Sequence, residues 1–362
     1  MRELNTKEKS NQLCSGIRDG YALLELARGW LKQGNSLVAG ELLGSAIVSA
    51  EAEADSELRA QVLKETGRAQ MMQSEWRGAE SNYLEAQRVF VGISNLKGAS
   101  ECARNRANMQ FQQGNYQLAE ELCEKALDWA SEINDHELRA TILNTLGAIK
   151  TTYGDFQEAI KTFKLCLSDF RSSGNLIRQG YVLLNIGLSL TELEQYDEAV
   201  SSLNESLSIA LEEKDLSLVE ICYQNISKCY LEMNETQLAK SVIDTARKIL
   251  PGLNSAALES ELNLIDCRIL REMGDLFGAE QLLDRTYAMA SEHSLTAVCA
   301  DVLLEQGKNA KAKGDSRIAV TKFKAAADQY RHLGVRTGYE CALDEIASAA
   351  SELETTKEFS LA

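Results

Sequence analysis

The chain has 362 residues and a formal net charge of -16, with 54 Asp and Glu against 38 Lys and Arg. A surface this acidic repels nucleic-acid phosphates and anionic lipid headgroups, so neither is expected as the main partner. Proline occurs once and Ala, Leu, Glu and Ser dominate, which favours helix over sheet throughout. Composition therefore predicts an all-α fold.

The N-terminal segment is charged and precedes no signal-type apolar core, and no stretch is apolar over the length that a membrane helix needs. The nine cysteines are odd in number, scattered and without a C-x-x-C pair, which indicates buried reduced thiols rather than disulfides or a zinc site. We expect a cytoplasmic protein without membrane insertion.

The organising feature is a period of forty residues, marked by an alanine at the same place in eight successive repeats. The column runs Ala39, Ala79, Ala119, Ala159, Ala199, Ala239, Ala279 and Ala319, without insertion or deletion. A fixed period of this length is typical of a solenoid of helix pairs. It spans most of the chain, so one long body is the simpler prediction.

Two further columns contain only small residues. Twelve positions before the alanine stand Ala27, Gly67, Ala107, Gly147, Gly187, Ser227, Cys267 and Gly307; seven positions after it stand Ala46, Ala86, Ala126, Cys166, Ser206, Ala246, Thr286 and Ala326. Helices approach one another closely only where their side chains are small. Each repeat is therefore expected to be a tightly packed antiparallel pair, helix A and helix B, that stacks on the next.

A turn lies between the first two columns, with Gly at its first position in five repeats and Asn234 in a sixth. Such residues tolerate the positive φ that ends a helix. The following residue is short and polar in most repeats, as Asn35 or Asp155, and favours the start of helix B. Short polar residues such as Asp55 and Asp135 mark a second turn that restarts helix A.

A small residue, then Gly-Asp or Gly-Asn with an aromatic, then Ala, as in LGAIKTTYGDFQEAIKTF at 146–163, resembles the tetratricopeptide repeat. The resemblance covers about residues 20–340 and implies a right-handed α-solenoid. The usual repeat of that family has thirty-four residues, so this chain resembles its long-helix branch, seen in kinesin light chains, spindle-orientation adaptors and bacterial sensory domains. We expect a terminal extension at 1–19, eight repeats over 20–336, and a C-terminal capping helix with its tail over 337–362.

Members of this family bind partners on the surface lined by helices A. One column there is basic in five of eight repeats although acid predominates in the chain: Arg28, Arg68, Asn108, Ala148, Leu188, Lys228, Arg268 and Lys308. A neighbouring column adds two cations and two amides: Lys64, Arg104, Asn144 and Gln224.

We hypothesise that an acidic or carboxylate-bearing segment of a partner lies along these residues, held by charge-assisted hydrogen bonds. The alternative is that the cations pair with acidic neighbours on adjacent repeats and merely solvate the inner wall.

No pattern indicates catalysis or a cofactor. The three histidines are separated by whole repeats or more, and the glycines follow the forty-residue period rather than a phosphate-binding loop. The sequence therefore predicts a protein-binding scaffold or adaptor that is not an enzyme. Two alternatives stay open: a sensory module of a bacterial signalling or transcription-regulating protein whose output domain is absent here, and a homo-oligomer.

Overall fold

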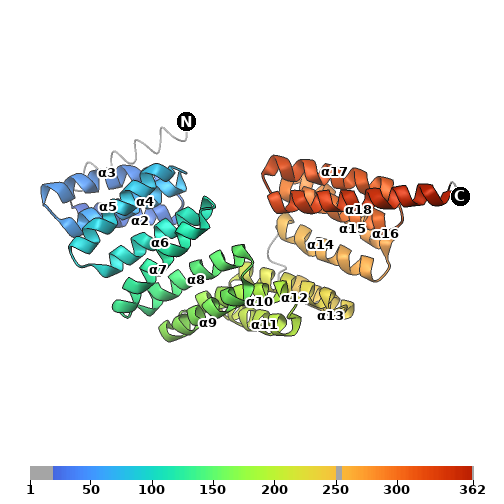
Figure 1. Ribbon diagram of the computed structural model, residues 1–362, viewed down its shortest axis with the longest axis horizontal. Helices are drawn as coiled ribbons and strands as arrows, with labels where there is room; N and C mark the ends of the chain where they lie inside the picture. The colour runs from blue at the N-terminus through green and yellow to red at the C-terminus, as the bar shows by residue number, and fades with distance from the viewer. Residues whose placement is uncertain (1–18, 250–254, 361–362) are drawn as a thin grey trace. The chain divides into compact units, whose positions relative to one another are not determined.

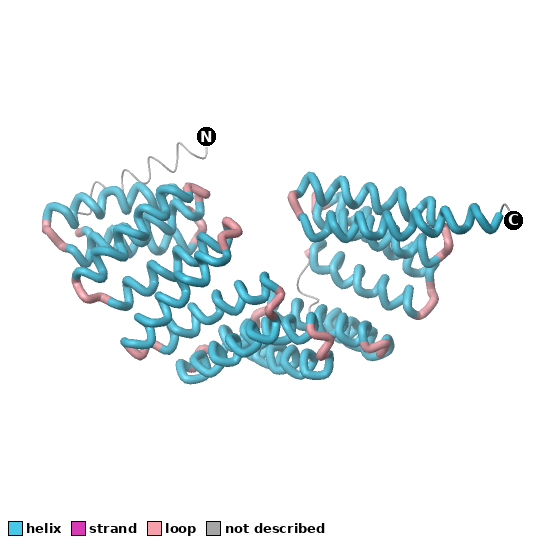
Figure 2. The backbone as a smooth tube through the Cα atoms, in the orientation of Figure 1, coloured by secondary structure: helices cyan, strands magenta, loops and turns pink. Residues whose placement is uncertain are grey.

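The computed structural model describes residues 19–249 and 255–360, and side chains as far as residue 352. This part holds seventeen helices and no strand (Figure 2), which confirms the predicted all-α fold. Residues 1–18, most of the expected N-terminal extension, lie outside the described residues, as do Pro251 and the last two residues.

Helices A and B alternate along the chain (Figure 1). The A helices are α2 (Gly20–Lys32), α4 (Ser56–Met72), α6 (Leu96–Gln112), α8 (His136–Tyr153), α10 (Leu176–Glu192), α12 (Leu216–Glu232), α14 (Ala256–Glu272), α16 (Thr296–Ala312) and α18 (Arg336–Ser360). The B helices are α3 (Ser36–Ala52), α5 (Trp76–Gly92), α7 (Tyr116–Glu132), α9 (Phe156–Ser173), α11 (Tyr196–Glu213), α13 (Thr236–Ile249), α15 (Leu276–Glu292) and α17 (Ser316–Leu333). Every B helix begins forty residues after the one before it.

Both turns of each repeat use the same backbone device. A residue with positive φ stands every twenty positions among the described residues, from Gly34 at +79° to Gly334 at +70°. The first turn was expected to contain this conformation. The second turn has it as well, and there it falls mostly on non-glycine residues such as Ala54 and Lys214. Polar side chains then cap the next helix: Asp55 accepts from the Leu58 backbone N–H at 2.9 Å.

The three small-residue columns are buried, as predicted, and each alanine of the first column is fully inaccessible. Some of the small residues on helix A face a large side chain on helix B of the same repeat. A Cβ added at Gly67 would lie 3.0 Å from the ring of Tyr83, and Gly147 and Gly307 face Phe163 and Phe323 even more closely. Glycine on helix A therefore makes room for an aromatic ring on helix B.

Successive A helices contact one another directly, as α2 with α4 and α14 with α16, whereas successive B helices do not to a comparable extent among the described residues. In a stack of helix pairs, the layer with the closer neighbours lies on the inner side of the curvature. The A helices therefore line the inner side of each part of the stack.

The chain divides into two compact units, residues 1–189 and 190–362, and the boundary falls within α10. Each contains helix pairs of the same kind and a buried apolar core. The expected eight repeats over 20–336 within a single body stay a prediction. The segment expected to form the capping helix lies in α18, whose buried residues Ala342 and Ala349 pack with those of α17; its role as a cap stays a prediction.

Candidate binding site

A cleft of about 540 Å³ opens on the inner face of unit 1. It is lined mainly by α2, α4 and α6, and α5 contributes one side chain to it. The lining residues are Arg28, Lys32, Lys64, Glu65, Arg68, Met71, Tyr83, Glu101, Arg104, Asn105 and Asn108. The cleft thus brings together five residues that the sequence predicted for the groove: Arg28, Lys64, Arg68, Arg104 and Asn108.

Helical spacing explains why these side chains converge. Lys64 and Arg68 are four residues apart on α4, and Arg104 and Asn108 are four residues apart on α6, so each pair shares one face of its helix. The forty-residue period then repeats this face on the neighbouring A helix.

Ion pairs connect neighbouring A helices at a constant offset of thirty-seven residues. Arg28 Nε donates to Glu65 Oε1 at 3.1 Å, and Lys64 pairs with Glu101. Glu65 is largely buried, so the pair with Arg28 compensates a charge that would otherwise be costly. Pairing with acidic neighbours on adjacent repeats is therefore real for Arg28 and Lys64.

Arg104 and Arg68 break this pattern. The residues at the same offset are Thr141 for Arg104 and Asn105 for Arg68, and neither carries a charge. Arg68 reaches only Glu65, at 3.8 Å, and its side chain is 42% exposed. Arg104 donates one hydrogen bond, to Asn105 at 3.0 Å, and burial lowers its pKa from the ordinary arginine value. These two cations are thus available to a ligand.

The amides of the inner face form a short polar ladder. Thr145 donates to Asn108 Oδ1 at 3.0 Å, which directs the Asn108 amide nitrogen elsewhere. Further along, Asn185 donates to Asn144 Oδ1 at 3.2 Å. Asn144 therefore lies on the inner face beyond the cleft and does not line it.

Unit 2 carries the remaining predicted residues. Arg268 and Lys308 both contact the buried Glu305, at 2.9 and 3.5 Å, and Arg271 joins them at 2.9 Å. Burial opposes the charge of Glu305, but the three cations outweigh it and lower its pKa. Here the cations hold a carboxylate of the chain itself.

The two other predicted residues of unit 2 lie on α12. Gln224 donates to Glu220 and to Glu261, at 3.2 and 2.6 Å. Lys228 is exposed. Neither lines a cleft among those described.

Sequence reasoning missed Tyr83, which reaches the cleft from helix B and is fully buried. Its signal was present but unused: Tyr83 stands sixteen residues after Gly67, the spacing that also joins Gly147 to Phe163. Glu65, Glu101 and Lys32 were missed because the columns were searched for cations and amides in the predicted register alone.

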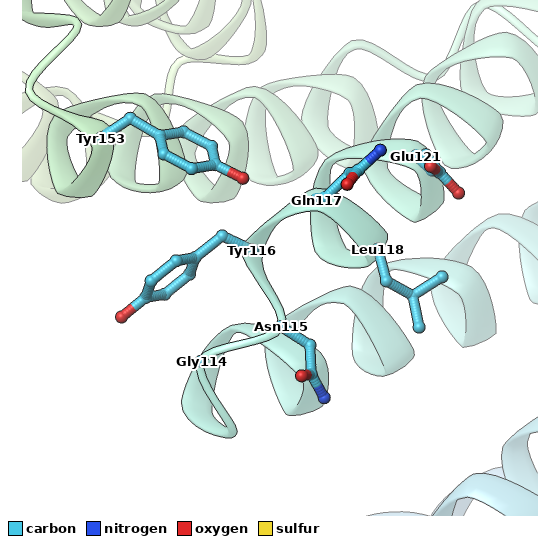
Figure 3. A pocket seen from close by; sticks show the side chains of 7 residues that line it. All are labelled: Gly114, Asn115, Tyr116, Gln117, Leu118, Glu121 and Tyr153. Carbon is cyan, nitrogen blue, oxygen red and sulfur yellow. The ribbon is translucent and has the colours of Figure 1, made fainter.

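A second hollow lies beside the turn between α6 and α7 of unit 1, and its lining includes Tyr116 and Tyr153 (Figure 3). Their ring centroids are 5.8 Å apart in an edge-to-face arrangement, and Phe111 packs on Tyr116 at 5.5 Å. The aromatic residue that follows the turn thus joins two neighbouring repeats. Packing among these three aromatic rings accounts for the residues at this hollow, so it is not a candidate binding site.

We also searched the described part of the chain for metal sites, reactive cysteines and membrane-spanning helices. No group of three or more His, Cys, Asp or Glu there is placed to hold a metal ion. Seven of the eight described cysteines are buried free thiols, as expected, but Cys341 is exposed on α18. None of the helices is long and apolar enough to cross a bilayer, as far as the described residues go.

Profiles described as tetratricopeptide repeat match residues 100–172 and 181–213. These matches agree with the forty-residue helix pairs that the structure shows. The chain contains tetratricopeptide repeats. Such repeats are non-enzymatic scaffolds for contacts between proteins, which supports an interaction or regulatory module here.

Relatives and solved structures agree with this assignment. Protein KINESIN LIGHT CHAIN-RELATED 2 of Arabidopsis thaliana is 26% identical over 264 residues, 69% of this chain and 39% of that protein. The repeat protein thus spans less than half of the curated relatives that it matches.

Two solved structures share the fold at low identity. One is a STAND signal transduction ATPase with a tetratricopeptide repeat sensor, from Pyrococcus horikoshii: TM-score 0.65, 16% identity, 82% of this chain and 46% of that one. The other is a Rap protein complexed with competence and sporulation factor: TM-score 0.54, 14% identity, 93% of this chain and 98% of that one.

Proposed function

We propose that this protein is a cytoplasmic adaptor that holds an acidic segment of a partner protein in the inner cleft of unit 1. The observation that carries the proposal is the charge of that cleft. Five cations line it against two carboxylates, in a chain whose net charge is -16. An acidic ligand is repelled at long range by most of this surface and attracted at the cleft, which gives orientation and selectivity.

The residues that line the cleft have different roles in this proposal. Arg28 and Lys64 are held in place by Glu65 and Glu101, so they form a rigid wall. Arg104, which has no ion pair among the described residues, and Arg68, whose contact with Glu65 is long, supply the least compensated charge. Guanidinium groups bind carboxylates through paired hydrogen bonds. Asn108 offers its amide nitrogen to the ligand backbone.

The other predicted residues form secondary contacts in this proposal. Lys228 is exposed, whereas Arg268 and Lys308 are partly neutralised by Glu305. Asn144 and Gln224 already bond to neighbours, so they contribute less.

The test is affinity capture from the native host followed by mass spectrometry, with wild type and with the double variant Arg68→Glu, Arg104→Glu. The matched control is Arg77→Glu with Arg88→Glu, two exposed positions of α5. Loss of specific partners from the cleft variant alone supports the proposal. Identical capture by all three proteins would refute it.

A second candidate is a sensory module of a larger signalling protein. It is favoured by the fold shared with the sensor-bearing ATPase, of which this chain covers 46%. An output domain encoded in the same open reading frame would decide for it. Self-association is a separate question, which light scattering of the purified chain answers.

A further inference from the structure

Two buried polar atoms beside the cleft of unit 1 have no hydrogen-bond partner in the described part of the chain. They are Nε of Arg104 and Oη of Tyr83. Buried polar groups are nearly always paired in native proteins, because an unpaired one loses its contact with water and gains nothing. Both residues line the same cleft, so one ligand can satisfy both.

The surrounding charges show what that ligand must carry. Glu65 and Glu101 are engaged by Arg28 and Lys64, which leaves Lys32, Arg68 and Arg104 as excess positive charge. Among the described residues no carboxylate lies within ion-pair distance of Arg104, whose one side-chain hydrogen bond goes to neutral Asn105. The missing group is therefore an anion.

The number of donors distinguishes between anions. Arg104 and Tyr83, whose Nε and Oη have no partner among the described residues, line the cleft together with Arg68 and Lys32. A carboxylate offers two oxygens and one charge. A phosphate monoester offers three acceptor oxygens and a charge of about -1.5 to -2 at neutral pH. The cleft has more donors and more positive charge than one carboxylate can satisfy, which matches the phosphate.

We propose that this part of the cleft binds the phosphate group of a phosphorylated serine or threonine within the partner's acidic segment. The inference rests on the proposed function and deepens it, since it makes capture of the partner dependent on phosphorylation. Guanidinium forks recognise phosphate through two parallel bonds, and the buried position of Arg104 strengthens them because water is excluded.

The experiment compares three pools of labelled peptides with the same degenerate acidic flanks and phosphoserine, glutamate or serine at the centre, by fluorescence anisotropy. We expect the phosphoserine pool to bind about tenfold or more tightly than the glutamate pool. Tyr83→Phe and Arg104→Lys should each reduce that preference, because the first removes one hydroxyl and the second keeps the charge but loses the fork. Arg88→Lys, on the exposed side of α5, should not.

Each outcome has one meaning. Equal affinity for the phosphoserine and glutamate pools overturns the phosphate inference and leaves the acidic-segment proposal standing. Binding of none of the acidic pools overturns both. Inorganic phosphate is expected to compete only at far higher concentration than the phosphopeptides; if it binds as tightly as they do, the ligand is a free phosphate and the peptide assignment is wrong.

Discussion

Gly147 on α8 packs against the ring of Phe163 on α9 so closely that a Cβ at residue 147 would overlap the ring. Alanine favours helix over glycine by about 1 kcal/mol, but overpacking a buried site costs about 1–3 kcal/mol. We therefore predict that Gly147→Ala lowers the free energy of unfolding, measured by urea denaturation, and that Phe163→Leu in the same chain restores part of it.

The matched control is Gly29→Ala on α2, where nothing lies within 4 Å of the added methyl group. Here only the helix propensity acts, so a gain of about 0.5–1 kcal/mol is expected. Equal effects at the two positions would show that the fit between glycine and ring has no energetic role.

The repeated positive φ gives a second prediction. Lys214 holds φ at +58°, a conformation that costs a side-chain-bearing residue about 1 kcal/mol relative to glycine. Lys214→Gly should therefore raise stability, whereas Gly154→Ala, at φ +82°, should lower it. Thermal unfolding of both variants checks the opposite signs, and a shift in the same direction would contradict the shared turn geometry.

Glu305 makes the free energy of unfolding depend on pH. Its pKa is lowered in the folded state, so its stabilisation is present above the unfolded value of about 4.3 and disappears as pH falls through the folded value. We predict that Glu305→Gln costs about 3–5 kcal/mol at pH 7, since it leaves three cations without their carboxylate. The deficit should shrink below about pH 4. A pH-independent deficit would contradict the ion-pair explanation.

Arg28 and Arg104 should respond oppositely to the same change. Arg28→Met leaves the buried Glu65 with only the distant Arg68 and should cost about 1–3 kcal/mol. Arg104→Met removes a buried charge without a partner, so it should be neutral or stabilising. Urea denaturation of the free protein distinguishes them. A large destabilisation by Arg104→Met would mark that arginine as structural.

Much of the fold could be predicted from the sequence, because a small residue such as Ala39 recurs every forty positions and small residues let helices pack closely. The structure shows all eight of these alanines fully buried. The sequence did not predict the second set of left-handed residues, since Ala54 and Lys214 carry no glycine signal; the stacked repeats hold them there. Local chemistry predicts a glycine turn, whereas tertiary packing can impose the same turn on other residues.

For the site, sequence located the inner columns but not the difference among their members. Arg28 and Arg104 are the same residue type in neighbouring columns, but the residue thirty-seven positions on is Glu65 for the first, with which it pairs, and uncharged Thr141 for the second. Once the thirty-seven-residue offset is known, this distinction can be read from the sequence. The spacing of Tyr83 from Gly67 can be read from the sequence as well, but the missing hydrogen-bond partners of Tyr83 Oη and Arg104 Nε depend on packing between helices and cannot.

The central claim is that Arg104 is retained for binding rather than for folding. The most direct measurement is the dissociation constant of the captured partner segment for wild type, Arg104→Met and Arg88→Met, each with its melting temperature. We predict a loss of about tenfold or more for Arg104→Met alone, with no fall in its melting temperature. Unchanged affinity in Arg104→Met, or an equal loss in Arg88→Met, would contradict the claim.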